Sequence, residues 1–139
     1  MGCGEEALLR SGWRIPRHKL TDAEVEQAAD LARRIAAHPT SQNREPIHHL
    51  GEAEAMVLVQ RAEFAGAVLL LDELAARAIA LEIGLQISGF AGVLLLAVEE
   101  GLLGAAEVKK RLERCQQQGT HYGAHFIRRV YEAAKEVEE

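Results

Sequence analysis

The sequence predicts an α/β domain with a small, mainly parallel sheet flanked by helices. Two short apolar segments, residues 67–71 and 85–88, have the length and composition of buried strands. About a dozen residues of helical character separate them, and a connection of that length joins parallel strands through a helix. The 139 residues fit one domain, 1–139, and a hydrophobic content of 48% argues against disorder.

Before the first strand, the pattern predicts two helices. The first begins after Thr21, which can form a capping box with Glu24, and it ends at Pro39. Its apolar positions recur at helical spacing: Val25, Ala28, Ala29, Ala32 and Ile35. After a polar loop, a second helix is expected over about 51–63. The residues expected to be buried on it are Ala55, Met56, Leu58 and Val59.

After the first strand, the pattern predicts four helices. They are expected at residues 74–83, 89–100, 105–117 and 124–137. Gly84 and Gly101 end the first two as C-terminal caps, and Gly119 separates the last two. Gly89 and Gly92 lie at a strand-to-helix turn. A dinucleotide fingerprint needs a third glycine, so this pair indicates close packing of helix against sheet.

Charge and hydropathy exclude several classes of protein. The net charge is -5, so we expect no DNA partner. The longest uncharged run, residues 83–98, is 16 residues long, shorter than the roughly 20 apolar residues that span a bilayer. No signal peptide is recognisable. Cys3 and Cys115 are too far apart to indicate a disulfide framework, and two reduced thiols are typical of a cytoplasmic protein.

Two acids stand where the first strand ends. Asp72 and Glu73 directly follow residues 67–71, and ligands in parallel sheets bind beyond the carboxyl ends of the strands. One interpretation is helix capping, with Asp72 as N-cap and Glu73 in the first turn. The other is ligation of Mg²⁺ or Mn²⁺ by a carboxylate held on a buried strand. The two interpretations are compatible.

Other ligand candidates lie on neighbouring helices. Glu52 and Glu54 begin the helix that precedes the first strand, where they could be solvated acids or share a cation with Asp72. His121 and His125 have the four-residue spacing of a zinc-binding pair, but no third ligand is close in the sequence. Basic pairs on the helices are typical of solvated faces, and the alternative is contact with a phosphate backbone.

Several blocks together resemble the PIN-domain family. They are HLGEAEA at 49–55, LLLDE at 69–73 followed by Ala76 and Arg77, GFAGVL at 89–94 and EGL at 100–102. Their order and spacing match across residues 49–103. The chain is most similar to a prokaryotic PIN-like subgroup that is related to VapC-type toxin ribonucleases.

The resemblance implies a three-layer α/β sandwich that hydrolyses single-stranded RNA with Mg²⁺ or Mn²⁺. It assigns Glu52 and Asp72 as metal ligands, matching the third and fourth acids of the family, with Glu73 as a catalytic helper. A small antitoxin protein is the partner that the toxin relationship implies. The bound cation would activate water and neutralise charge on the phosphate.

The start of the chain departs from the family pattern. The family begins with a buried strand that ends in an aspartate, whereas residues 1–20 define no clear element beyond a short edge strand expected at 13–18. We therefore expect an N-terminally incomplete fold. Glu5 and Glu6 are the acids available near the start, but no strand precedes them. An unpaired sheet edge would favour a homo-oligomer. The alternative function is a non-catalytic PIN-like module for binding or oligomerisation.

Overall fold

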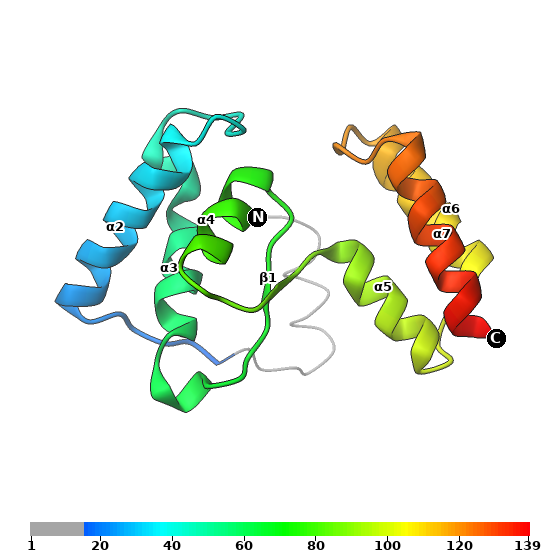
Figure 1. The fold of residues 1–139 in the computed structure, drawn as a ribbon. Coiled ribbons are helices and arrows are strands. Elements are labelled where there is room, and N and C mark those ends of the chain that lie inside the picture. Colours follow the sequence, from blue (N-terminus) through cyan, green and yellow to red (C-terminus); the bar gives the residue numbers. More distant parts are fainter. Residues whose placement is uncertain (1–15) are drawn as a thin grey trace.

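The computed structural model describes residues 16–139 (Figure 1). Six α-helices are present in this range: α2 (Asp22–Ala37), α3 (Leu50–Val59), α4 (Leu74–Glu82), α5 (Phe90–Glu99), α6 (Ala105–Gln117) and α7 (Ala124–Glu138). Two 3₁₀ turns flank α3: η1 (Pro46–His49) and η2 (Ala62–Phe64). Two strands lie between the helices: β1 (Leu69–Leu70) and β2 (Ile87–Ser88).

The strands are parallel, and α4 connects them. Leu69 pairs with Ile87, and the Leu71 N–H donates to the Ser88 carbonyl at 2.8 Å. This confirms the predicted strand–helix–strand unit. Both strands are shorter than predicted, because regular pairing covers two residues on each, and Leu70 is 61% exposed.

The ends of the helices follow local hydrogen bonding. Thr21 and Glu24 form the predicted capping box at the start of α2. Gly84, with φ of +79°, lets the Leu85 N–H reach the Ala80 carbonyl at 3.0 Å and closes α4. Helix α3 ends at Val59, before the predicted residue 63.

An ion pair explains the early end of α3. Arg61 has an extended backbone and directs its guanidinium to both carboxylate oxygens of Glu24, at 2.7 and 2.9 Å. The same guanidinium donates to the Lys19 carbonyl at 2.8 Å. These bonds tie the loop after α3 to the start of α2.

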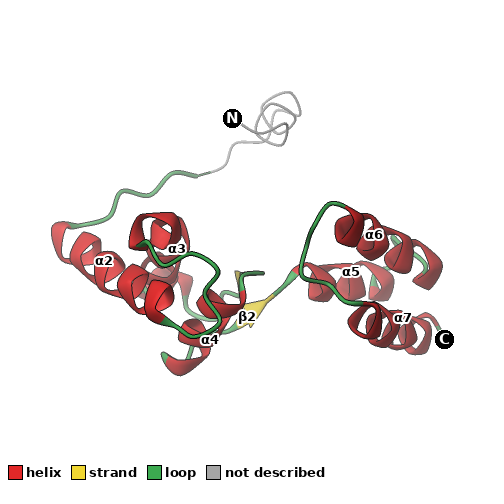
Figure 2. Ribbon diagram, turned by 90° about the horizontal axis from the view of Figure 1, so that it is seen from above, coloured by secondary structure: helices red, strands yellow, loops and turns green. Residues whose placement is uncertain are grey.

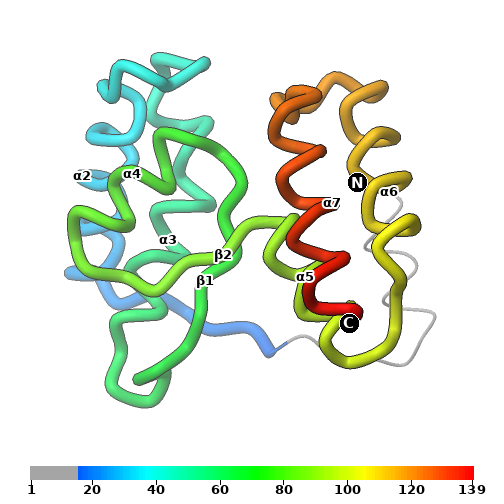
Figure 3. Tube along the Cα trace, turned by 45° about the vertical axis from the view of Figure 1, so that its right-hand side comes forward, coloured from blue at the N-terminus to red at the C-terminus, as the bar shows by residue number. Residues whose placement is uncertain are grey.

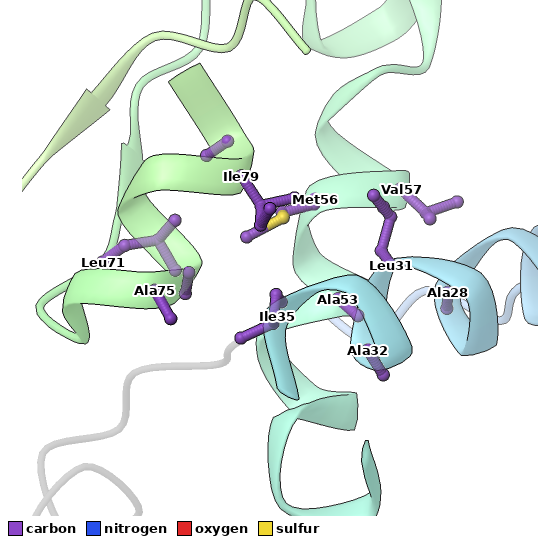
Figure 4. Packing of buried hydrophobic residues seen from close by; sticks show 12 residues of the cluster. Ala28, Leu31, Ala32, Ile35, Ala53, Met56, Val57, Leu71, Ala75 and Ile79 are labelled. Atoms are coloured by element: carbon purple, nitrogen blue, oxygen red, sulfur yellow. The ribbon is translucent and has the colours of Figure 1, made fainter. Parts of the chain in front are cut away.

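The buried hydrophobic residues form two clusters, one on each side of the sheet (Figures 1 and 2). The first joins α2, α3, α4 and Leu71. In it Met56 lies against Ile79 with Ile35 beside them (Figure 4). The second joins α5, α6, α7 and Tyr122. Helices on both sides of a small parallel sheet confirm the predicted α/β class. Figure 3 shows the two strands side by side between two helical groups, one made of α2, α3 and α4 and the other of α5, α6 and α7.

Some expected core positions are not buried. Val25 is 53% exposed, because the face of α2 that packs on α3 and α4 is centred on Leu31, Ala32 and Ile35. On α3, Ala53 and Val57 are buried with Met56. Three expected core residues of that helix are only half-buried: Ala55, Leu58 and Val59.

The structure bears only in part on the predictions for the first residues, the cysteines and membrane spans. Cys3, Glu5 and Glu6 lie outside the described residues, as does most of the edge strand expected at 13–18, and residues 16–18 form no strand. Cys115 is a free, half-buried thiol. In the part of the chain that the structure describes, every helix is too short or too polar to cross a membrane.

Candidate functional site

Three potential metal ligands meet where η1, α3 and α4 begin or end. His49, Glu52 and Glu73 each offer a ligand atom, and these atoms all lie within 4.8 Å of one another. We call these three residues the acid cluster. His49 closes η1, Glu52 lies in the first turn of α3, and Glu73 precedes α4. Short elements that meet at one place therefore bring together residues 24 positions apart.

His49 positions Glu52. The imidazole is buried, and its Nδ1 lies 3.2 Å from Glu52 Oε2. Its Nε2 lies 2.8 Å from the Asn43 carbonyl and 3.2 Å from Ser41 Oγ. Because a carbonyl only accepts hydrogen bonds, Nε2 carries a hydrogen.

Opposing effects act on the pKa of His49, and together they raise it. Burial acts to lower the pKa of the imidazole, but the hydrogen bonds to Asn43 and Glu52 and the charges of Glu52 and Glu73 raise it above its ordinary value. The contact between His49 Nδ1 and Glu52 Oε2 holds the Glu52 carboxylate in place.

Glu73 is the N-cap of α4. Its Oε2 accepts from the Ala76 N–H at 2.6 Å. The sequence predicted Asp72 as the cap and Glu73 in the first turn, so this assignment was wrong by one residue. The physical reason is that Glu73 has the extended backbone of a cap, while the Asp72 carboxylate bonds elsewhere.

Asp72 is exposed and directed toward α5 and the loop before α7. Its Oδ1 accepts from the Phe90 N–H at 3.1 Å and from the Tyr122 hydroxyl at 2.9 Å. Burial and the bond to Asp72 raise the pKa of Tyr122 well above its ordinary value, so the phenol keeps its proton. Asp72 thus joins the two helical groups.

The glycine pair serves close packing, as predicted. A Cβ on Gly89 would lie 2.9 Å from Arg77 Nη1 and 3.0 Å from Asp72 Oδ1. A Cβ on Gly92 would collide with the Ser88 hydroxyl. Arg77 Nη1 also donates to the Leu71 carbonyl at 2.8 Å, so polar groups crowd the end of the sheet.

A cavity of about 500 Å³ opens beside Asp72. Residues from both helical groups line it. They include Arg77 of α4, His121 and Tyr122 of the loop before α7, and Phe126 of α7, and Ser88 of β2 also lines the cavity. Nothing in the sequence relates Tyr122 to Asp72, because 50 positions separate them.

The predicted site residues are therefore divided. Glu52 and Glu73 meet in the acid cluster, whereas Asp72 is not part of it. No role was predicted for His49 from the sequence, although its place three residues before Glu52 was a usable signal. Within residues 16–139, His121 and His125 belong to no group of three metal ligands.

The chain was compared with protein families, curated proteins and solved structures. A family model described as a PIN domain matches residues 8–136. Neither a curated protein nor a solved structure matches the chain. The family model spans the two strands, both helical groups and the acid cluster. PIN domains have a nuclease-type fold and typically bind divalent metals. The chain belongs to the PIN-domain family.

Proposed function

We propose that this protein is a metal-dependent endoribonuclease of the toxin–antitoxin type, which cleaves single-stranded RNA with Mg²⁺ or Mn²⁺. The observation that carries the proposal is the acid cluster. Glu52 lies in α3 and Glu73 caps α4, and their ligand atoms lie within 4.8 Å of each other in a chain of a nuclease-type family.

The donor set of the acid cluster fits a hard divalent cation. Mg²⁺ and Mn²⁺ prefer carboxylate oxygens, and two carboxylates this close repel each other without a cation. We infer that Glu52 and Glu73 would hold the ion. Asp72 lies outside this donor set, because its carboxylate is bonded to the Phe90 N–H and the Tyr122 hydroxyl.

The protein's contribution to the chemistry is to fix the carboxylates. The imidazole of His49 orients Glu52, and the Ala76 N–H orients Glu73. A bound cation would lower the pKa of a coordinated water and neutralise charge on the scissile phosphate. Carboxylates that are already held in place lose little freedom when an ion binds.

The test is cleavage of a labelled single-stranded RNA in Mn²⁺. Removal of the metal by EDTA, and the variants Glu52→Gln and Glu73→Gln, should each lower the rate about hundredfold or more, because each removes part of the metal site. Glu54→Gln is the matched control, since Glu54 is exposed on the same helix and outside the acid cluster.

Two results would contradict the proposal. One is cleavage that continues in EDTA, and the other is a wild-type rate in both cluster variants. Circular dichroism would show that the variants are folded.

A ribonuclease of the toxin–antitoxin type would also have a characteristic compartment, partner and substrate class. We propose that the protein acts in the cytoplasm, that a small antitoxin protein blocks its acid cluster, and that DNA is not a substrate. Co-expression with a protein encoded beside it, followed by co-purification and loss of RNA cleavage, would support an antitoxin partner. Cleavage of single-stranded DNA as fast as RNA would contradict the substrate class.

The exposed side chains near β1 favour a second candidate function. Val68 is 55% exposed, Leu70 61% and Leu74 48%. Exposed apolar side chains of this kind suit a non-catalytic PIN-like module that forms homo-oligomers. Light scattering in EDTA should then detect an oligomer that Leu70→Lys disrupts. Leu102→Lys is the control, because Leu102 is 75% exposed and lies far from both strands in the sequence. A wild-type monomer would contradict this function.

A further inference from the structure

We propose that the cavity beside Asp72 binds one nucleotide of a single-stranded RNA, with its base stacked on Phe126 and its phosphate on Arg77. This inference rests on the proposed function and assigns a substrate site to it. The cavity volume of about 500 Å³ is within the range of pockets that hold small ligands. Its walls come from both helical groups, at the carboxyl ends of β1 and β2.

Two rings form one wall of this cavity. Phe126 and Tyr122 are stacked, with centroids 5.2 Å apart and an angle of 19° between the ring planes. Tyr122 is 6% exposed and is held by its bond to Asp72, while Phe126 is 40% exposed. The inner ring thus supports an outer ring that is open to solvent. Such a platform stacks any base, because every base has a π-face.

The cation in the cavity suits a phosphate. Arg77 takes part in none of the ion pairs among residues 16–139. Its Nη1 donates to the Leu71 carbonyl at 2.8 Å, which holds the guanidinium at the cavity wall. A guanidinium has five N–H donors, so others remain for phosphate oxygens.

The cavity also adjoins the acid cluster along the chain. Asp72 lines the cavity, and its neighbour Glu73 belongs to the cluster. The cavity and the acid cluster therefore share the segment that links β1 to α4, where Asp72 and Glu73 are consecutive. The Asp72 carboxylate can in addition accept a hydrogen bond from a base amino group.

The test measures the binding of a short fluorescein-labelled single-stranded RNA by fluorescence anisotropy. EDTA is present so that no cleavage occurs. Phe126→Leu keeps an apolar side chain but removes the ring, and it should weaken binding about tenfold or more. Phe126→Trp restores a ring and should bind at least as well as the wild type. Phe64→Leu is the matched control, because Phe64 lies outside the cavity.

The outcomes separate this inference from the proposed function. If Phe126→Leu alone weakens binding, the RNA site stands even when no variant cleaves RNA. If the wild type cleaves RNA but Phe126→Leu binds as tightly, the site is wrong and the ribonuclease stands. Equal losses in Phe64→Leu and Phe126→Leu, or no RNA binding by the wild type, would also overturn the site. Thermal unfolding would check that Phe126→Leu is folded, and Phe126→Trp tests the ring independently.

Discussion

Gly89 lies where three polar groups converge at the end of the sheet. Arg77 Nη1, Asp72 Oδ1 and the Leu71 carbonyl would all lie within 3.5 Å of a Cβ at this position. The first two atoms are already engaged, Arg77 with Leu71 and Asp72 with the Phe90 N–H. A side chain here would have to displace one of them. The φ of Gly89 is -109°, which is accessible to any residue, so the backbone conformation does not require glycine here. The close approach of these groups does.

We expect Gly89→Ala to destabilise the protein by about 1–3 kcal/mol, because the added methyl overpacks this site. Gly51→Ala is the opposite case, since a Cβ there meets nothing within 4 Å and the residue lies in helix α3. That change should stabilise by about 0.5–1 kcal/mol. Urea unfolding measures both, and equal stabilities of the two variants would contradict the packing at Gly89.

The predicted site acids show how far a sequence can specify a site. The position of Asp72 and Glu73 after a strand was enough to mark both as candidates. The sequence could not show that Glu73 caps α4, because aspartate is a preferred N-cap residue and glutamate is not. Which of the two acids caps α4 depends on Tyr122 and Phe90, because they supply hydrogen-bond partners for Asp72 from other elements.

At the scale of elements, the start of α2 is tied to the loop after α3. The Thr21 N–H donates to Glu24 Oε1 at 2.9 Å, and Arg61 binds the same carboxylate through two nitrogens. The hydrogen bond from Arg61, followed by that from the Thr21 backbone, lowers the pKa of Glu24 to about 2. The carboxylate therefore stays charged in strongly acidic solution.

The lowered pKa predicts a pH dependence of stability. The unfolded chain protonates Glu24 near its ordinary value of 4.5, whereas the folded chain does so at about 2. The stabilisation is therefore complete above about pH 4.5 and is lost as the pH falls toward 2. Chemical denaturation across this range should show a shallower loss of stability in Glu24→Gln than in the wild type.

Glu26→Gln is the control for this dependence, because Glu26 is exposed on the same helix. The stability of this variant should fall with pH as steeply as that of the wild type. Parallel slopes for Glu24→Gln and the wild type would show that the ion pair with Arg61 contributes nothing.

Most elements could be predicted from the sequence, because their signals are local. The capping box of α2, the glycine after α4 and the parallel strands were all expected. The end of α3 was not, because it depends on the distant contact between Arg61 and Glu24. The width of a buried face was also not predictable, since periodicity gives its direction while the neighbouring helix decides which residues it covers. Val25 is an example.

At the scale of the whole molecule, few links join the two hydrophobic clusters. The chain passes directly from β2 into α5 (Figure 3). The Tyr122 hydroxyl donates to Asp72 across the junction. The RNA cavity that we propose lies at this junction. Its lining could not be predicted from sequence, because it forms only when the two helical groups meet.

Tyr122→Phe should destabilise the protein by about 1 kcal/mol, because it removes a hydrogen bond to a carboxylate and leaves the ring in place. Tyr131→Phe is the matched control, because among residues 16–139 no hydrogen bond of the Tyr131 hydroxyl is found. Urea unfolding of both variants measures the difference. Equal stabilities would mean that this bond does not hold the junction.

The most direct test of the central claim is a calorimetric titration of Mn²⁺ into the wild type and Glu73→Gln. The glutamine keeps a side-chain oxygen for the Ala76 N–H, so the cap of α4 survives while the charge is lost. If Glu52 and Glu73 hold the cation, the wild type binds Mn²⁺ and Glu73→Gln does not, while Glu54→Gln binds like the wild type. No binding by the wild type at millimolar Mn²⁺, or unchanged binding by Glu73→Gln, would contradict the metal site.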